Sequence, residues 1–262
     1  AISGLQMQTV FRNPLAGPSV LGISSGASMG VAFVVLLSGS LGGVALSKLG
    51  FMGEIALSIA AVIGSLSVMA LIVYVSQKVK GNVTLLIIGV MIGYVANAVI
   101  GVLKFFSVEE DIRAYVIWGL GSFSRVSGNQ MMLFVAIMAI LIPLSFLLIK
   151  TLNLMLLGDG YARNLGLNIK RARLLVITSA GVLTAIVTAY CGPVIFLGLA
   201  VPHLCRAIFQ TSDHRVLMPA VLFAGAALAL VCNLIARLRR GFAGQLGDCP
   251  DRCSGSGLRS IP

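Results

Sequence analysis

The chain has 262 residues, of which 58% are hydrophobic and only 10% are charged. A soluble domain carries about 25% charged residues, so this composition excludes an ordinary water-soluble fold and indicates a protein whose solvent is lipid. Lys and Arg number 19 against 8 Asp and Glu. In a membrane protein this excess reflects basic cytoplasmic loops, and we therefore expect no nucleic acid among the partners.

The first ten residues read as the end of an apolar helix, so we expect the chain to begin inside a longer protein. Pro14 and Pro18 in the stretch NPLAGP then stop helix continuation. Apolar segments of about 20 residues, enough to span a bilayer, follow near 21–40, 55–76, 83–103, 131–149, 174–191 and 216–236, with a shorter one at 194–209. With residues 1–10 they make about eight membrane elements. They are too long and too uniformly apolar for an outer-membrane barrel, so we predict an all-α polytopic membrane helix bundle.

The loops between these segments differ in charge. One alternating set holds ten Lys and Arg residues, at positions 12, 78, 80, 150, 163, 170, 171, 173, 206 and 215, and the other holds five, at 48, 104, 113, 125 and 237. The acidic cluster Glu109, Glu110 and Asp111 lies in the second set. By the positive-inside rule the first set faces the cytoplasm, which places the NPLAGP turn and the 150–173 loop on that side.

The 150–173 loop is the largest cytoplasmic one, and it contains helix signals. Asp159 is expected to cap a short helix over GYARNL, Gly166 to end it, and Asn168 to cap the next helix. Two short helices here fit either a solvated connector or a docking surface for a cytoplasmic partner. On the opposite side, Tyr115 and Trp118 indicate a short interfacial helix whose rings lie at the membrane–water boundary.

Small residues recur at every fourth position in two apolar segments. They are Gly22, Gly26 and Gly30 in one segment and Gly89 and Gly93 in the other. Such faces let helix backbones approach closely in lipid. This pattern fits ordinary helix packing, and it also fits close-packed helices that border a transport pathway.

Residues that could perform chemistry are scarce. The apolar segments carry almost no ionisable side chain apart from His203, which follows a proline and is more typical of a packed group than of a metal ligand. No zinc, P-loop, nucleophile-elbow or paired-carboxylate motif is present. We therefore expect a non-catalytic protein with no metal site and no cofactor. The alternative to a subunit powered by a partner is a stand-alone secondary transporter of a small organic solute, which would need coupling residues of its own.

Four stretches match the motifs of one family in order and spacing. They are RNPLAGPSVLGISSGASMG, LGDGYARNLGLNIKRAR, GPVIFLGLAVPHLCR and TSDHRVLMPAVLFAGAALALVCNLIAR. Over about residues 1–238 the chain resembles the FecCD family of ABC importer permeases. The resemblance implies a ten-helix permease fold, of which the first helix, most of the second and the tenth are absent from this chain.

The resemblance also implies a function. The family imports iron–siderophore complexes, haem or cobalamin across the bacterial cytoplasmic (inner) membrane. Two permease copies, identical or related, pair with two ABC ATPase subunits and with an extracytoplasmic substrate-binding protein. The permease itself hydrolyses nothing. Iron–siderophore is the cargo that this resemblance favours.

By the same resemblance, three groups of residues acquire roles. Asn13, Leu15 and Asn82 correspond to a gate at the cytoplasmic end of the pathway. Arg237 corresponds to an arginine that pairs with a carboxylate of the binding protein. The remaining group is the ATPase-coupling loop, whose residues here are Gly158, Asp159, Ala162, Arg163, Leu165 and Gly166.

The tail over 239–262 differs from the rest of the chain, because apolar helix gives way to Gly, Ser, Arg and Cys. Cys249 and Cys253, with no other Cys or His nearby, are poor evidence for a metal site or a disulfide. Permitted codons for FAGQLGDCPDRCSGS, read one base later, encode LPVNSVTALIGAPVL, which resembles the family motif leading into its tenth helix. We therefore predict a permease domain over 1–238 and a non-native, frameshifted tail that begins near 238–241.

Overall fold

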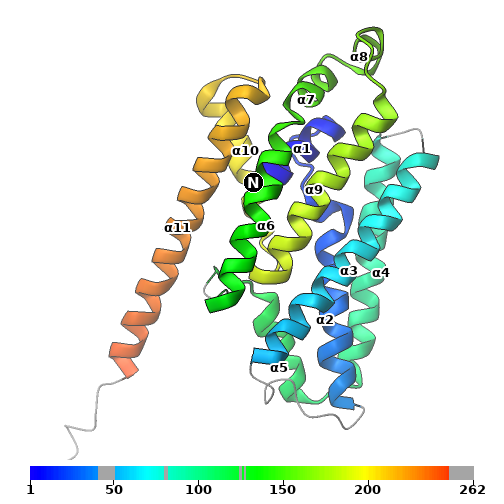
Figure 1. The fold of residues 1–262 in the computed structure, drawn as a ribbon. Coiled ribbons are helices and arrows are strands. Elements are labelled where there is room, and N and C mark those ends of the chain that lie inside the picture. Colours follow the sequence, from blue (N-terminus) through cyan, green and yellow to red (C-terminus); the bar gives the residue numbers. More distant parts are fainter. Residues whose placement is uncertain (41–50, 80–81, 124–125, 127, 248–262) are drawn as a thin grey trace, which may run out of the picture.

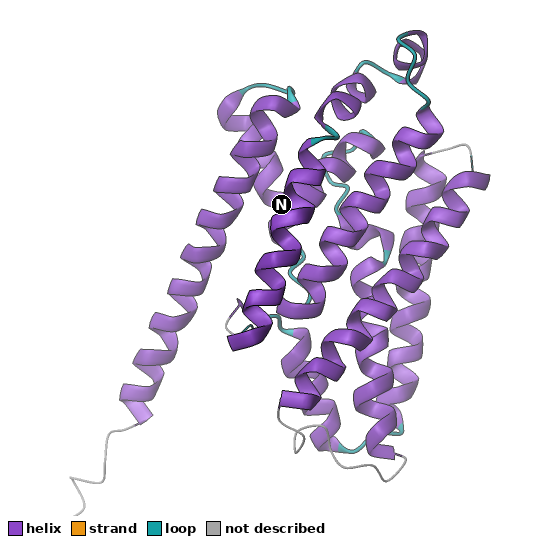
Figure 2. Ribbon diagram, in the orientation of Figure 1, coloured by secondary structure: helices purple, strands orange, loops and turns teal. Residues whose placement is uncertain are grey.

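The computed structural model describes the chain except residues 41–50, 80–81, 124–125, 127 and 248–262. Within the described part every regular element is a helix, and no strand occurs (Figure 1, Figure 2). The elements are α1 (Ile2–Phe11), the 3-10 helix η1 (Pro18–Leu21), α2 (Ile23–Ser40), α3 (Phe51–Lys78), α4 (Asn82–Phe105), α5 (Glu109–Gly119), α6 (Gly128–Phe146), α7 (Ile149–Leu156), α8 (Asp159–Asn164), α9 (Ile169–Cys191), α10 (Phe196–Phe209) and α11 (His214–Gly247). The prediction of an all-α bundle is confirmed.

Each apolar segment expected from the sequence lies on a helix. Four of the described helices are each long and apolar enough to cross a membrane, and these are α3, α4, α9 and α11. α6 and α7 make a fifth crossing if the pair, which is bent by 43°, is counted as one span. α2 and α10 contribute shorter apolar helices. The chain is therefore a multi-pass membrane protein.

The helices run between two ends of the molecule (Figure 1). One end carries the turn after α1, the short helices α7 and α8, and the connection between α10 and α11, whereas α5 lies at the other end. The basic loops that the sequence assigns to the cytoplasm thus gather at the end that holds α8. We call it the cytoplasmic end.

α1 and α9 form the centre of the bundle. α1 is buried along its whole length, and α9 contacts α1, α2, α3 and α6. The buried side of α9 is rich in small residues, including Ala172, Ala180, Ala185 and Ala189. Lipid offers helices no hydrophobic drive to associate, so close packing of small side chains is what stabilises such a contact.

Glycines determine how closely α2 and α3 approach. A Cβ atom added to Gly26 would lie 2.6 Å from the carbonyl oxygen of Gly64, and one added to Gly30 would overlap the carbonyl oxygen of Ala60. Two of the five glycines singled out from the sequence therefore lie in a backbone-to-backbone contact. Any larger residue at these positions would force the two helices apart.

The other three glycines hold η1 against α4. Gly22 lies just after η1 with a φ of +73°, a conformation that L side chains rarely adopt, so it is a turn residue rather than the first member of a helix face. On α4, a Cβ at Gly89 would lie 2.8 Å from Leu21 Cα, and one at Gly93 would lie 3.4 Å from Ser25 Oγ. Gly89 thus permits the close approach of α4 to η1.

α5 is the short helix expected on the outer side, but its aromatic rings do not form an exposed belt. Trp118 is only 2% exposed, and Tyr115 is also buried. Both belong to a buried cluster with side chains of α2 and with Ala189 of α9. The predicted belt is wrong for these two residues, because α5 packs on α2. A large aromatic ring buries more apolar area in that contact than at the membrane–water interface.

The predicted boundary at residue 238 falls inside α11. This helix continues without a break through residues 239–247 and ends at Gly247. Residues 248–262, including both cysteines of the tail, lie outside the described residues. The frameshifted origin of the tail remains a prediction.

Candidate functional site

The turn after α1 contains two of the three predicted gate residues. α1 ends at Phe11, and Arg12 then adopts a left-handed conformation with φ 49°. Asn13 Oδ1 accepts a hydrogen bond from the Leu15 amide at 2.9 Å, which fixes the turn. Leu15 is left 66% exposed. Asn82, the third gate residue, begins α4, and its side chain is not among those that the structure describes.

α7 and α8 form a compact knob at the cytoplasmic end (Figure 1). Gly158, with φ 105°, separates the two helices. A Schellman motif closes α8: the Leu167 amide bonds to the Ala162 carbonyl at 3.0 Å, and the Gly166 amide bonds to the Arg163 carbonyl at 2.9 Å. Gly166 has φ 86°, so it ends the short helix as expected.

Asp159 does not cap α8, which corrects the expectation from the sequence. The N-cap position is Gly158, without a side-chain hydrogen bond, and Asp159 is the first helical residue. Its carboxylate faces two guanidinium groups instead, with Arg12 Nη2 at 2.5 Å and Arg173 Nη2 at 3.6 Å. A charged donor gives a carboxylate a stronger hydrogen bond than a backbone amide does. Asn168, in contrast, does cap α9.

The knob presents apolar side chains to its surroundings. Tyr161 is 73% exposed and Leu165 61%, and Leu157 is exposed as well. Ala162 lies beneath them and is fully buried. Apolar side chains that gather on an exposed projection are typical of a surface that contacts a protein or a membrane, and the exposed Arg163 adds a positive charge to this one.

A polar network joins the knob to α11 and α1. Asn153 Oδ1 on α7 accepts hydrogen bonds from the backbone amide of His214 at 2.9 Å and from its ring Nδ1 at 2.8 Å, and Asn153 Nδ2 donates to Asp213 Oδ1 at 2.6 Å. The other ring nitrogen of His214 lies 2.8 Å from Thr9 Oγ1. The Arg215 amide and the Asn153 side chain together hold the pKa of the Asp213 carboxyl below its usual range. Reasoning from the sequence missed this network, because a single Asn on a short helix carries no pattern.

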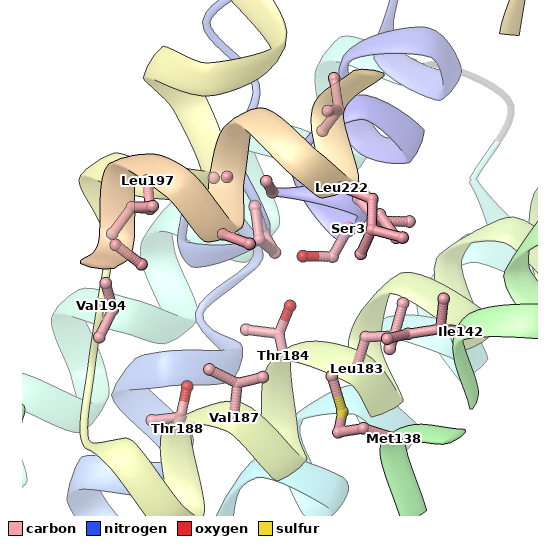
Figure 3. A pocket seen from close by; sticks show the side chains of 18 of the residues that line it. Ser3, Met138, Ile142, Leu183, Thr184, Val187, Thr188, Val194, Leu197 and Leu222 are labelled. Atoms are coloured by element: carbon pink, nitrogen blue, oxygen red, sulfur yellow. The ribbon is translucent and has the colours of Figure 1, made fainter. Parts of the chain in front are cut away.

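A cavity of about 380 Å³ lies among α1, α6, α9, α10 and α11 (Figure 3). Its wall is mainly apolar and includes Met138, Leu183 and Leu222, while Ser3 and Thr184 direct hydroxyl groups toward it. Small-molecule sites range over about 300–1,000 Å³. The cavity therefore lies near the lower limit of that range.

Two further residues singled out from the sequence, Arg237 and His203, lie on α11 and α10. Arg237 is on α11, and its side chain is outside the described set. His203 is exposed on α10. Among the residues that the structure describes, no group of three or more His, Cys, Asp or Glu could hold a metal ion.

These features define a polytopic α-helical membrane protein with a two-helix knob at its basic end. The sequence profile of the FecCD transport family matches residues 1–241. The chain belongs to this family.

Individual relatives agree with that assignment. The chain is 35% identical over 238 residues to the vitamin B12 import system permease protein BtuC of Klebsiella pneumoniae subsp. pneumoniae, a match that covers 91% of this chain and 68% of that protein. It is 34% identical over 238 residues to the hemin transport system permease protein HmuU of Yersinia pestis, with 90% and 69% covered. A solved ABC transporter assigned to the metal-chelate type, in an inward-facing conformation, aligns with a TM-score of 0.79 and 28% identity over 90% of this chain and 72% of that one. The chain is thus a permease subunit of an ABC importer, a class that works with an ATPase partner.

Proposed function

We propose that this permease moves a bulky metal chelate across the bacterial inner membrane, with an iron–siderophore complex as the first cargo to test and haem and cobalamin as the others. The similarity to permeases named for vitamin B12 and hemin supports a cargo of this size and chemistry. We propose that the cargo passes between two permease copies rather than through one.

A second permease copy requires a face for pairing, and α4 offers one. Met91, Tyr94 and Val95 of α4 are each more than half exposed. In lipid such a face can be covered either by acyl chains or by another helix. We propose that the second copy, identical or related, covers part of it and that membrane lipid covers the rest of the apolar surface.

The observation that carries the proposal is the knob formed by α7 and α8. It projects at the basic end, and its apolar side chains Leu157, Tyr161 and Leu165 are exposed. Its base is hydrogen-bonded to His214 at the start of α11, and the His214 ring in turn contacts Thr9 of α1. We propose that the part of the knob from Gly158 to Gly166 fits a cleft on the ATPase. ATP binding then favours one arrangement of the two permeases over the other, and the permease itself performs no catalysis.

At the two ends of the pathway we propose a gate and a receptor contact. The gate consists of Asn13, Leu15 and Asn82. The exposed apolar side chain of Leu15 supports this role because it is free to meet the equivalent turn of the second copy. On the outer side, Arg237 at the far end of α11 pairs with a carboxylate of an extracytoplasmic binding protein.

Uptake measurements test the function. The permease is produced in cells that lack their own chelate importers, together with its ATPase and binding protein, and uptake of radiolabelled ferric siderophore, haem and cobalamin is compared. We expect uptake of one of these chelates, and we expect it to stop when the ATPase cannot hydrolyse ATP. Uptake of a small organic solute that continues with an inactive ATPase would instead identify a stand-alone secondary transporter.

We also propose that residues 239–262 are the product of a frameshift and have no function. The family profile matches the chain only up to residue 241, which supports a loss of family sequence near this point. Resequencing the gene tests the idea. A second reading frame that encodes LPVNSVTALIGAPVL followed by an apolar helix is expected, and its absence would disprove the frameshift.

A further inference from the structure

Arg12 occupies a backbone position that usually belongs to glycine. α1 is closed by hydrogen bonds from the Arg12 amide to the Thr9 carbonyl at 3.3 Å and from the Asn13 amide to the Gln8 carbonyl at 3.1 Å, the pattern of a Schellman motif. The residue in left-handed conformation in this motif is Arg12, with φ 49°. An L side chain is strained there, whereas glycine is not. Strain of this kind points to a role for the Arg12 side chain.

The guanidinium group of Arg12 bridges the gate turn and the knob. Arg12 Nη2 donates to Asp159 Oδ1 at 2.5 Å and lies 3.5 Å from the Met155 carbonyl oxygen. It thus touches the last turn of α7 and the first residue of α8 at once. On the other side, only two residues separate Arg12 from Leu15 along the chain, and the Asn13 side chain bonds to the Leu15 amide at 2.9 Å.

The same carboxylate also reaches the central helix. Asp159 Oδ2 lies 3.6 Å from Arg173 Nη2 on α9. The carboxylate of Asp159 therefore contacts the end of α1 through one oxygen and α9 through the other. Both side chains of the Arg12–Asp159 pair are about half exposed, at 46% and 48%. An exposed pair contributes little to folding stability, so stability does not account for it.

We infer that the Arg12–Asp159 ion pair transmits movement of the ATPase-docking knob to the gate turn. Arg12 is a positioning residue: it acts on Leu15 through the turn and touches neither cargo nor nucleotide. This inference rests on the proposed function, because it requires the knob to dock on an ATPase and the turn to act as a gate. It adds the specific contact that couples the two.

Three variants test the link in the full complex of permease, ATPase and binding protein reconstituted in proteoliposomes. Arg12→Gly removes the side chain and relieves the backbone strain, so its melting temperature is expected to stay unchanged or rise. Asp159→Asn is isosteric and removes the charge. We expect both to lower the amount of chelate imported per ATP hydrolysed by about fivefold or more while the ATPase stays bound. Lys170→Ala, an exposed cation on α9, is the control and should couple normally.

The double variant separates a shared link from two independent roles. If the pair acts as a unit, Arg12→Gly combined with Asp159→Asn imports no less chelate per ATP than either single variant. Multiplied losses in the double variant, or wild-type coupling in both single variants, would overturn the inference. Failure of the proposed function would look different, because the wild-type complex itself would show no ATP-driven uptake.

Discussion

Replacing Asn153 by Ala removes the side chain that holds α7 to the start of α11. Its Oδ1 accepts from the backbone amide of His214 at 2.9 Å and from the ring Nδ1 at 2.8 Å. His214 is fully buried, so water cannot readily replace the lost acceptor. A buried donor without a partner costs about 1–3 kcal/mol. With two such donors and some relaxation, we expect the free energy of unfolding to fall by about 2–4 kcal/mol.

The network also predicts how Asn153→Asp behaves. Because an amide oxygen only accepts, His214 Nδ1 carries the proton, and Asn153 Nδ2 must face the Asp213 carboxylate, 2.6 Å away. An Asp at this position keeps the acceptor for His214 but sets a second carboxylate against Asp213. We expect a loss of stability at pH 7 that shrinks as the pH falls, because protonating one of two facing carboxyls removes their repulsion.

Thermal unfolding in detergent micelles measures both effects. The single tryptophan of the chain, Trp118, is buried and serves as the fluorescent reporter. At roughly 2–4 °C per kcal/mol for a chain of this size, Asn153→Ala should melt about 5–15 °C below the wild type. Asn164→Ala, an exposed Asn on α8, is the matched control. Equal melting temperatures for Asn153→Ala and this control would refute the argument from the network.

Three further substitutions have defined outcomes. Gly30→Leu should lower the melting temperature, because overpacking at the Ala60 carbonyl typically costs about 1–3 kcal/mol. Gly101→Leu, with no neighbour within 4 Å of the added Cβ, is its control. Equal melting temperatures for the two variants would contradict this prediction. Ala162→Pro deletes an amide hydrogen bond of 2.9 Å in α8 and costs about 3 kcal/mol of helix stability. The ATPase should then no longer co-purify with the permease, although the permease still inserts into the membrane. Normal chelate uptake by this variant would argue against docking of the ATPase on α8. Arg237→Glu should weaken binding-protein capture in a low-salt titration, with a difference that fades as salt rises; unchanged low-salt affinity would remove Arg237 from that contact.

Local sequence determined the helices and which of their ends carry the basic loops. Hydropathy located the membrane elements because a span of lipid demands a continuous apolar run whatever the helix packs on. Prolines and glycines near the ends of these runs marked the turns, and Gly166 and Asn168 act as helix-end signals in the structure as they do in the sequence. The four motif stretches identified the family for a related reason, since each carries its pattern within a short segment.

Tertiary structure alone decided which polar side chains meet. Arg12 and Asp159 are 147 positions apart, and Thr9 and His214 are 205 apart. A capping rule evaluates Asp159 only against its neighbours in sequence, so it could not find a stronger partner contributed by another helix. The prediction for Trp118 was wrong for the same reason, because whether its ring meets lipid or protein depends on where α2 lies. Periodicity shows that a face exists, and the packing of the bundle decides what that face touches.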